Sequence, residues 1–472
     1  MDSPIVVAGG GAAGRAAVQT LLTLTDQPIV HLAGPSGEAI DRTLVDKALM
    51  TGRVSPDRAV AMRPPLDGVD TRFDTLASVA EVPAGSDTTV AEVPVGSISD
   101  AAVVAGTGEA PAGPDTAACP GRGSSRLALT LGSGGVLGAA GLIVATGSTP
   151  RRLDVPGLEE WVRAERISTL HSVTDALRIR ELLEEVDGAR VLVSGTGLVG
   201  AEAASLLTEA GHHVTLVARS AVPGAAGLGA TIAGRLATIH EGAVETRWGT
   251  WVVALREGVA ALSDGSEVEA DLVVVAHGAE PHIPGGLLRD ETPDDRARPD
   301  GSRGDGSSPD EGRSDASRPS RGGGSARGAG HGSAADAGVP VDDRLRSAGW
   351  ENVLAAGAVA RFGPQPYRVD HWDDAEAQGA HAARTLLHDL GDGDDPGPYR
   401  PWSPWSARIH GRQLAGFGHP LPGSTERIVS EDPLLVEFIS AADGADTVCA
   451  VVGLDAGRAL RDHARTIGPH AP

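Results

Sequence analysis

The sequence predicts an α/β fold with two parallel-sheet units and a smaller α/β unit at the C-terminal end. The pattern G-x-G-x-x-G occurs at 9–14 and again at 195–200, each time between an apolar run and a stretch with helical spacing. Strand, tight turn and helix in this order form the phosphate-binding half of a Rossmann-like unit. After Tyr399 the sequence changes to short β segments, followed by a helix from about Gly457. These observations predict two Rossmann-like dinucleotide-binding domains and a small C-terminal α/β domain.

Charge and cysteine content exclude several kinds of partner and chemistry. The chain of 472 residues has a formal net charge of −23, which argues against nucleic acid and anionic membranes as partners. Its two cysteines, Cys119 and Cys449, lie far apart, so no redox dithiol is encoded locally. No signal peptide precedes the first strand, and no apolar run reaches the roughly 18 residues that a membrane span needs. We expect a cytoplasmic protein, and the oligomeric state stays open.

The first unit contains an apolar strand, the turn at 9–14 and a helix. Gly9 permits the turn, Gly11 lets the backbone approach a pyrophosphate, and Gly14 lets helix and strand pack closely. The helix N-terminus presents N–H groups and the positive end of a dipole to the phosphates. We therefore predict a cofactor site at this turn, and we include Ala13 in it.

The second strand of this unit, at 28–34, lacks a feature that such units usually have. An acidic residue near the end of this strand usually binds a ribose hydroxyl. Here Ser36 follows the strand, with Glu38 slightly beyond. We expect either a weaker contact from Ser36 or a carboxylate that reaches back from Glu38.

Lys47 is the only lysine among the 40 basic residues of the chain. A chain that uses arginine everywhere else places a lysine here, which favours a function that a planar guanidinium would not serve. Chance survival of one lysine is the alternative. No metal site is predicted, because the scattered histidines His371, His381 and His388 do not form a convincing ligand set.

The second unit has the same sequence of strand, glycine turn and helix as the first. A strand at 190–194 leads into the turn at 195–200, and a helical stretch follows. A strand at 271–278 closes the unit and ends in Gly278. The predicted cofactor-binding residues of the turn are Gly195, Gly197, Leu198, Val199 and Gly200.

The end of the next strand, at 213–219, bears on the choice of pyridine nucleotide. An acidic residue there binds the 2′-hydroxyl of NAD, whereas an arginine accommodates the 2′-phosphate of NADP. The sequence has Ala218 and then Arg219, with no acid. This favours NADPH. NADH stays open, because an arginine that only lies on the surface explains the pattern nearly as well.

Four further segments carry a family resemblance. Residues 42–47 read R-T-L-V-D-K, 145–151 read A-T-G-S-T-P-R, 355–358 read A-A-G-A and 368–372 read R-V-D-H-W. Together with the two turns, they resemble FAD-dependent pyridine-nucleotide oxidoreductases of the ferredoxin/rubredoxin reductase type. The resemblance covers almost the whole chain apart from two Gly-rich inserts. It implies FAD at the first turn and NAD(P)H at the second.

The resemblance also implies roles for single residues. Arg42 would contact the FAD pyrophosphate and Lys47 would lie beside the flavin ring, paired with Glu202, which follows the second turn. A helix start at His371 and Trp372 would face the flavin. Ala358 stands where the family has an aspartate that binds the ribityl chain, which together with Ser36 puts flavin affinity in doubt. The other implied cofactor-binding residues are Thr146, Gly147, Arg151, Gly278 and Gly357.

The predicted domains follow from these motifs. The FAD-binding domain comprises 1–150 and 279–397, the NAD(P)H-binding domain 151–278, and the C-terminal domain 398–472. Residues 97–126 are rich in Gly, Ala, Ser and Pro and are expected to form a loop. Residues 290–338 contain no Ile, Leu, Val, Met, Phe, Trp or Tyr, so a disordered insert is expected there.

The predicted function is an FAD-dependent NAD(P)H oxidoreductase, with Lys47 and Glu202 at the reactive edge of the flavin. Hydride passes from NAD(P)H to the flavin, and electrons pass on to an iron–sulfur carrier or a small-molecule acceptor. One alternative is a degenerate relative with weakened or lost flavin binding that acts as a nucleotide-binding or regulatory protein. The other is a flavin reductase or oxidase that acts on a small molecule. The family of ferredoxin/rubredoxin reductases has the signature P-x-F-W-S-D-Q, and this chain reads P-W-S-A-R at 404–408. The signature is thus kept only in part, so the sequence does not specify the electron acceptor.

Overall fold

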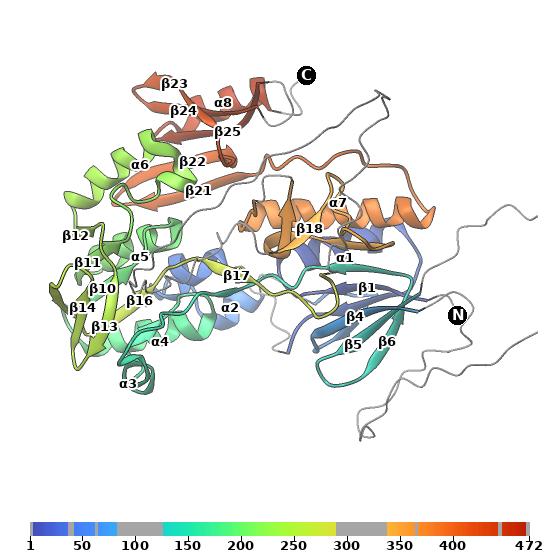
Figure 1. The fold of residues 1–472 in the computed structure, drawn as a ribbon, viewed down its shortest axis with the longest axis horizontal. Coiled ribbons are helices and arrows are strands. Elements are labelled where there is room, and N and C mark those ends of the chain that lie inside the picture. Colours follow the sequence, from blue (N-terminus) through green and yellow to red (C-terminus); the bar gives the residue numbers. More distant parts are fainter. Residues whose placement is uncertain are drawn as a thin grey trace, which may run out of the picture.

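The computed structural model describes residues 3–35, 42–61, 65–82, 126–288, 338–363, 367–441 and 446–468. Three five-stranded sheets organise these residues (Figure 1). Cys119, Ser36, Glu38, the expected loop at 97–125 and nearly all of the expected insert at 290–338 lie outside the described residues.

The first sheet is wholly parallel and has the order β19-β7-β1-β2-β3. Helices α1 and α7 cover one face, and the antiparallel sheet β4-β5-β6 lies against the other (Figure 1). Strands β1, β2, β7 and β19 are fully buried, which suits their near-continuous apolar sequences, whereas the edge strand β3 is polar and largely exposed. The elements are β1 (Ile5–Ala8), β2 (Ile29–Leu32), β3 (Asp70–Arg72), β4 (Leu76–Val82), β5 (Arg126–Leu131), β6 (Val136–Ala139), β7 (Gly141–Val144), β19 (Val353–Ala355), α1 (Ala12–Leu24) and α7 (Trp372–Leu390).

Small residues let α1 and α7 pack backbone to backbone. A Cβ added at Gly379 would lie 1.9 Å from the carbonyl oxygen of Ala13. A Cβ added at Gly357 would lie 3.0 Å from the Ala13 Cβ. Ala13 is therefore buried between three elements, and its small size is a packing requirement.

The second sheet is also parallel, in the order β12-β11-β10-β16-β9. An antiparallel sheet, β13-β14-β15, adjoins it, and the pair β8–β17 links it to the first unit (Figure 1). The strands are β8 (Ser148–Pro150), β9 (Ile167–Ser168), β10 (Arg190–Ser194), β11 (His213–Ala218), β12 (Glu245–Trp248), β13 (Val252–Arg256), β14 (Val259–Leu262), β15 (Glu267–Glu269), β16 (Leu272–Val275) and β17 (Ala279–Pro281). The helices are α3 (Leu158–Arg163), α4 (Val173–Glu185), α5 (Leu198–Glu209) and α6 (Ala225–Glu241).

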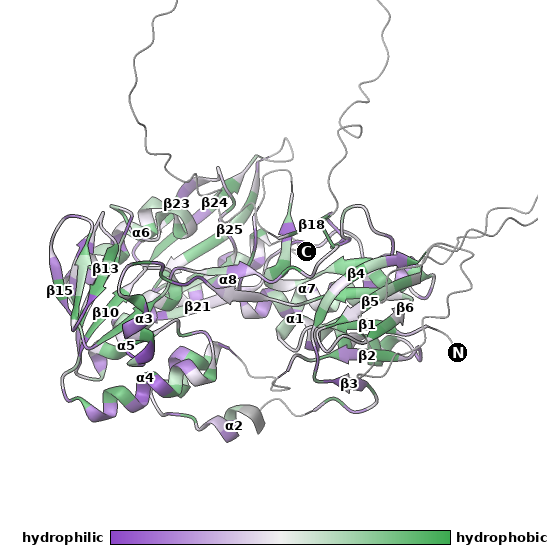
Figure 2. Ribbon diagram, turned by 60° about the horizontal axis from the view of Figure 1, so that its bottom comes forward, coloured by the Kyte–Doolittle hydropathy of each residue, from purple (hydrophilic) through white to green (hydrophobic). Residues whose placement is uncertain are grey.

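The third sheet is antiparallel, in the order β21-β22-β25-β24-β23, and carries a helix on each face. Apolar residues of α6 pack against one face, and α8 packs against the other. The elements are β21 (Pro404–Ile409), β22 (Arg412–Gly418), β23 (Thr425–Glu431), β24 (Leu434–Ser440), β25 (Thr447–Leu454) and α8 (Gly457–Ile467). In Figure 2, hydrophobic residues dominate β1, β10 and β25, whereas α4 alternates hydrophilic and hydrophobic stretches.

One segment of the first unit packs in the core of the second. The π-helix η1 (Val45–Leu49) and helix α2 (Pro56–Ala61) follow β2 in sequence. Val45 and Leu49 nevertheless share a core with Ala203 and Leu207 of α5. This crossing brings η1, and with it Lys47, to the side of α5.

Three short elements follow the second unit in sequence, where the chain has come back to the first unit. They are β18 (Val339–Val341), β20 (Ala360–Phe362) and the 3-10 turn η4 (Gly357–Val359), with β18 and β20 paired in parallel.

The predicted α/β fold is confirmed, with parallel strands on both sides of each G-x-G-x-x-G turn. The strand expected at 190–194 is observed with the same limits, as β10. The helix expected after the turn at 9–14 begins within that turn, at Ala12. β23 was not predicted, and Arg126 opens β5 rather than ending a loop. The proposed domain limits stay predictions.

Candidate cofactor-binding site

The first G-x-G-x-x-G turn has room for a ligand at only one of its three glycines. Gly9 has φ +135°, and a Cβ there would lie 1.9 Å from the Ala145 carbonyl oxygen. A Cβ at Gly14 would lie 1.9 Å from the Gly9 carbonyl oxygen. A Cβ at Gly11 would meet nothing within 4 Å. The first and third glycines therefore close the turn, and the second faces open space.

The second turn repeats this division of roles. Cβ atoms at Gly195 and Gly200 would lie 2.2 Å and 2.1 Å from the carbonyl oxygens of Ala276 and Gly195. Gly197 again faces open space. Two turns far apart in sequence thus form the same cradle.

Each cradle ends in a helix start that is suited to an anion. Gly11 and Gly197 are the N-cap residues of α1 and α5, and both have extended backbone with no side-chain cap. The first N–H groups of a helix have no partner within the helix, so a phosphate can accept from them. Leu198 is the first residue of α5, and Val199 after it is 43% exposed.

A buried histidine on β2 contacts the backbone of the first turn. His31 on β2 is buried, and its Nε2 lies 3.0 Å from the Gly9 carbonyl oxygen. Burial lowers the pKa of His31. The neutral ring can donate to this carbonyl and fix the turn. Sequence reasoning missed His31, because a histidine in an apolar strand gives no local signal of what lies opposite it.

Arg42 lies in a group of charged and polar side chains beside the ends of β7 and α7. Asp370, just before α7, accepts a hydrogen bond from the Ser148 hydroxyl at 3.2 Å. His171 Nε2 lies 3.2 Å from the Ser148 carbonyl oxygen. Burial lowers the pKa of His171, and the nearby Arg42 lowers it further. Arg42 therefore lies close to His171 and Asp370, and its contact with a pyrophosphate stays a prediction.

The backbone around Ala358 is held by side chains of other segments. Gln378 Oε1 accepts from the Gly357 N–H at 2.7 Å. Arg368 donates to the Ala358 carbonyl oxygen at 2.6 Å. Ala358 is buried in the turn η4. The turn keeps its shape without the carboxylate that the family has at this position.

Other predicted residues lie where strands and helices end. Gly147 and Gly278 both have positive φ, +73° and +77°, and follow β7 and β16. Thr146 donates to the His282 carbonyl oxygen at 2.5 Å. His371 is the N-cap of α7, which has no side-chain cap. Trp372 donates its indole N–H to Glu376 at 3.0 Å.

Lys47 and Glu202 form the ion pair that the resemblance predicts. Lys47 Nζ lies 3.4 Å from Glu202 Oε1 and donates to the Ser406 carbonyl oxygen at 3.3 Å. Glu202 Oε1 also accepts from the Arg408 backbone N–H at 2.9 Å. Three parts of the chain, η1, α5 and β21, thus meet at one carboxylate. The Glu202 side chain is 7% exposed and the Lys47 side chain 39%, so the pair is buried on one side only.

A second carboxylate lies near this pair. Asp46 is buried, and burial raises its pKa. Burial, together with the charge of Asp46, raises the pKa of Glu202 to about 7, against the opposing effect of Lys47. Lys47 thus lies close to two buried acids and lowers the pKa of both, whereas burial of each carboxyl group raises it.

The second turn is flanked by cationic and aromatic side chains. The Arg219 guanidinium lies 5.5 Å from the ring centroid of Trp251. His277 Nε2 lies 2.8 Å from the Ser194 hydroxyl. Burial lowers the pKa of His277, and Arg219 and Arg151 lower it further. Arg151 also pairs with Glu280 at 3.5 Å. Sequence reasoning missed His277 and Trp251, since neither lies in a motif.

The donor set fits the phosphates of a dinucleotide at both turns. Each turn offers an open glycine and an uncapped helix start, and Arg42 lies close enough to Asp370, just before α7, to interact with it electrostatically. The fit to the sugar portions at the first turn is weaker, because Ala358 has no hydrogen-bonding side chain and Ser36 lies outside the described residues. FAD therefore fits the cradle, with fewer side-chain donors and acceptors than the family motif provides.

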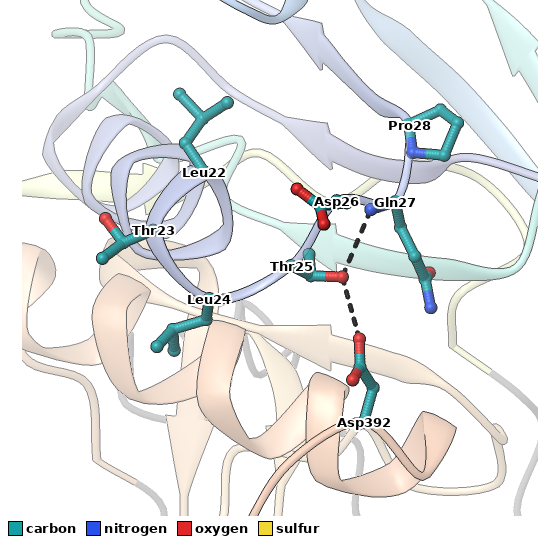
Figure 3. A pocket seen from close by; sticks show the side chains of 8 residues that line it. All are labelled: Leu22, Thr23, Leu24, Thr25, Asp26, Gln27, Pro28 and Asp392. Atoms are coloured by element: carbon teal, nitrogen blue, oxygen red, sulfur yellow. Dashed lines mark hydrogen bonds between the residues drawn. The ribbon is translucent and has the colours of Figure 1, made fainter.

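The hollow in Figure 3 is no part of this site. It is lined by residues after and within the last turn of α1, at the opposite end of that helix from the phosphate cradle. A hydrogen bond from Thr25 to Asp392, at 2.8 Å, crosses it. Among the described residues, no group of three or more His, Cys, Asp or Glu side chains could hold a metal ion. No helix in the described part of the chain is long and apolar enough to cross a membrane.

Two cradles joined through a Lys–Glu pair define a protein with two dinucleotide sites. Residues 3–291 match the family described as pyridine nucleotide-disulphide oxidoreductase, so the chain belongs to that family. The predicted resemblance is thereby confirmed.

Relatives and solved structures agree with this assignment. The chain is 35% identical over 150 residues to a terpredoxin reductase of a Pseudomonas species, covering 30% of this chain and 35% of that protein. It is 30% identical over 153 residues to a rubredoxin-NAD(+) reductase of Acinetobacter baylyi, covering 30% and 37%. A covalent putidaredoxin reductase–putidaredoxin complex has the same fold, with a TM-score of 0.67, 18% identity and coverage of 98% of this chain and 93% of that one. The matched regions thus span little more than a third of the two reductases from Pseudomonas and Acinetobacter.

Proposed function

We propose that the protein is an FAD-dependent oxidoreductase that takes hydride from NADPH and passes electrons to a small iron–sulfur protein of the ferredoxin or rubredoxin kind. The ion pair between Lys47 and Glu202 carries this proposal, because it joins the segment after the first cradle to the helix of the second. Family membership implies FAD and NAD(H).

Different residues of the chain would bind the phosphates and stabilise charge on the flavin. Arg42 and the start of α1 would bind the FAD pyrophosphate, and the start of α5 would bind that of the nicotinamide nucleotide. When bound, FAD would supply the redox chemistry, because a flavin can take up a hydride and give up electrons one at a time. Lys47 would place an ammonium beside the flavin ring, where it favours negative charge. Glu202 holds the ammonium, and the Arg408 N–H holds Glu202.

The choice of NADPH rests on the end of β11. The rubredoxin-NAD(+) reductase relative is named for NAD. This chain instead has Arg219 directly after β11, stacked on Trp251, and no acid at 218–220. An arginine at that place supports binding of a 2′-phosphate.

The acceptor is proposed by analogy with relatives. Terpredoxin reductase and rubredoxin-NAD(+) reductase are named for small electron carriers, and putidaredoxin reductase was solved in complex with putidaredoxin. No redox dithiol is encoded locally, since the two cysteines lie far apart in sequence.

Ala358 supports a second candidate, a nucleotide-binding relative that has lost its flavin. One experiment separates the two. The protein is purified, supplied with FAD, and assayed for NADPH oxidation with oxygen alone and then with added ferredoxin or rubredoxin. We expect bound flavin and oxidation that depends on the carrier. A colourless protein that binds no FAD by calorimetry would support the second candidate, and equal rates without a carrier would support an oxidase.

A further inference from the structure

The inference concerns Trp251, which lies beside the end of β11. The Arg219 guanidinium lies 5.5 Å from the centroid of its ring. Trp251 is 43% exposed, so the indole is a large apolar surface that the fold leaves in solvent. Within the described part of the chain, Arg219 has no hydrogen bond and no ion pair with a carboxylate. An arginine stacked on an aromatic ring keeps its N–H donors, which lie in the guanidinium plane, available to a ligand.

The backbone fixes the indole relative to Arg219. The Thr250 N–H donates to the Ala218 carbonyl at 3.1 Å, and the Gly249 N–H donates to the Ser220 carbonyl at 3.4 Å. On the other side, the Trp251 N–H donates to the Ser263 hydroxyl at 3.2 Å. The loop that carries Trp251 is therefore tied to the residues on both sides of Arg219.

The electrostatics of this corner favour an anion. The charged groups that bear on His277, at the end of the adjacent strand β16, are Arg219 and Arg151, and both are cations. A planar guanidinium donates in a fixed fork that matches phosphate. A side chain that is already ordered loses less freedom when it binds.

We propose that Trp251 is a positioning residue that orders Arg219 to bind the adenosine 2′-phosphate of NADPH. Trp251 acts through Arg219 and is not itself the adenine-binding surface. The inference rests on the proposed use of NADPH and adds the residue that makes Arg219 selective. Loss of the indole should therefore weaken the binding of ligands that carry a 2′-phosphate and leave the binding of ligands without one unchanged.

The test uses two adenosine ligands, 2′,5′-ADP and 5′-AMP, which differ in the 2′-phosphate. Binding to the FAD-supplied protein is measured by calorimetry for wild type, Trp251→Ala, Trp251→Phe, Arg219→Ala and the Arg219→Ala/Trp251→Ala double variant. Arg235→Ala is the control, since Arg235 is 61% exposed on α6 of the same unit. An exposed cation–π contact predicts about a two- to fivefold loss of 2′,5′-ADP affinity in Trp251→Ala.

The expected pattern has four parts. Trp251→Ala leaves 5′-AMP binding unchanged, Trp251→Phe keeps most of the 2′,5′-ADP affinity, Arg235→Ala changes neither, and Trp251→Ala has no further effect once Arg219 is alanine. In steady-state assays, Trp251→Ala raises KM for NADPH and leaves kcat and the NADH kinetics unchanged.

Two results would overturn the inference alone. Equal weakening of both ligands would make the indole an adenine-binding surface, and unchanged 2′,5′-ADP affinity in Trp251→Ala would remove its role. A wild-type protein that binds both ligands equally would contradict the proposed use of NADPH, and the inference with it. Thermal unfolding of each variant, with Trp251→Phe as the milder change, separates lost binding from lost folding.

Discussion

The two G-x-G-x-x-G turns have the same cradle and different surroundings. In both, the first and third glycines are closed off by carbonyl oxygens that would lie very near an added Cβ, at 1.9 Å for Gly9 and Gly14 and at 2.2 Å and 2.1 Å for Gly195 and Gly200. In both, the middle glycine faces open space. The shape of each turn is therefore fixed by close approaches to backbone atoms, with the middle glycine left open.

The surroundings differ in what they offer beyond the phosphates. At the first turn, β2 is followed by Gly34 and Pro35, and η4 carries Ala358 where the family has an aspartate. At the second turn, β11 ends beside Arg219, which is stacked on Trp251. The first turn thus has no carboxylate at position 358, whereas the second has a cation directly after β11, where an acid would suit NAD.

This contrast teaches that the cradle and its selectivity are encoded separately. The cradle is conferred by three glycines at fixed spacing, and it forms wherever a strand, turn and helix follow one another. Selectivity and affinity come from side chains on other strands, so they can change without disturbing the turn. Four predictions probe this separation, in order of expected effect.

The largest effect is expected from closing the first cradle. Gly14→Ala should lower the free energy of unfolding by about 3 kcal/mol, because its Cβ would lie 1.9 Å from a backbone oxygen that cannot move aside. Gly11→Ala is the matched control, since its Cβ meets no atom within 4 Å. Gly11→Ala should fold like wild type and bind FAD more weakly. Thermal unfolding and FAD titration of both variants check this. Equal stability of the two variants would contradict the difference between the closed position of Gly14 and the open position of Gly11.

The next effect concerns Glu202, whose pKa burial and Asp46 raise from 4.5 to about 7. The folded protein binds this proton more tightly than the unfolded chain does, so the free energy of unfolding falls as pH rises from about 4.5 to about 7. Over that window wild type should lose up to about 3 kcal/mol relative to Glu202→Gln. Denaturant unfolding at several pH values measures it. Parallel pH profiles for the two proteins would show that Glu202 is an ordinary acid.

Lys47 should matter more for electron transfer than for nucleotide binding. Lys47→Met removes the ammonium 3.4 Å from Glu202, and we expect flavin reduction to slow by about tenfold and the reduction potential to fall. Lys47→Arg should also be impaired, because a guanidinium is larger and donates in a fixed plane. Stopped-flow reduction and redox titration are the measurements. Wild-type rate and potential in Lys47→Met would make Lys47 a surface charge.

The smallest effect is expected at the weakened end of the first site. Ala358→Asp should strengthen FAD binding by about tenfold, which corresponds to the lower end of the about 1.5–3 kcal/mol that one charge-assisted hydrogen bond contributes. Arg368, which donates to the Ala358 carbonyl, would help to balance the added charge. Calorimetric titration of FAD into both proteins checks this. Unchanged or weaker binding would mean that the site does not use a carboxylate there.

The sequence predicts the local parts of this protein well. The strand–turn–helix segments and the basic residue directly after β11 lie where their motifs indicate, because each motif contains its own geometry. The ion pair of Lys47 with Glu202 follows from the family resemblance and not from spacing, since the two residues lie far apart in sequence. The parallel order of the two sheets follows from the same units.

What the sequence does not reveal depends on distant segments. The packing of η1 in the core of the second unit, the bond from His31 to Gly9, and the position of Trp251 against Arg219 all join residues from separate elements. No spacing rule relates such residues, because their proximity is produced by tertiary packing. Asp46 was likewise missed as a second acid, since its burial beside Glu202 depends on that crossing.

The central claim is that FAD occupies the first cradle and that NADPH, bound at the second, reduces it. The most direct test mixes the FAD-loaded protein with one equivalent of NADPH or NADH without oxygen and follows the visible absorbance of the flavin. The account predicts complete bleaching with both nucleotides, faster with NADPH, and loss of that advantage in Arg219→Ala. Flavin that stays oxidised with either nucleotide, or is reduced faster by NADH, would contradict it.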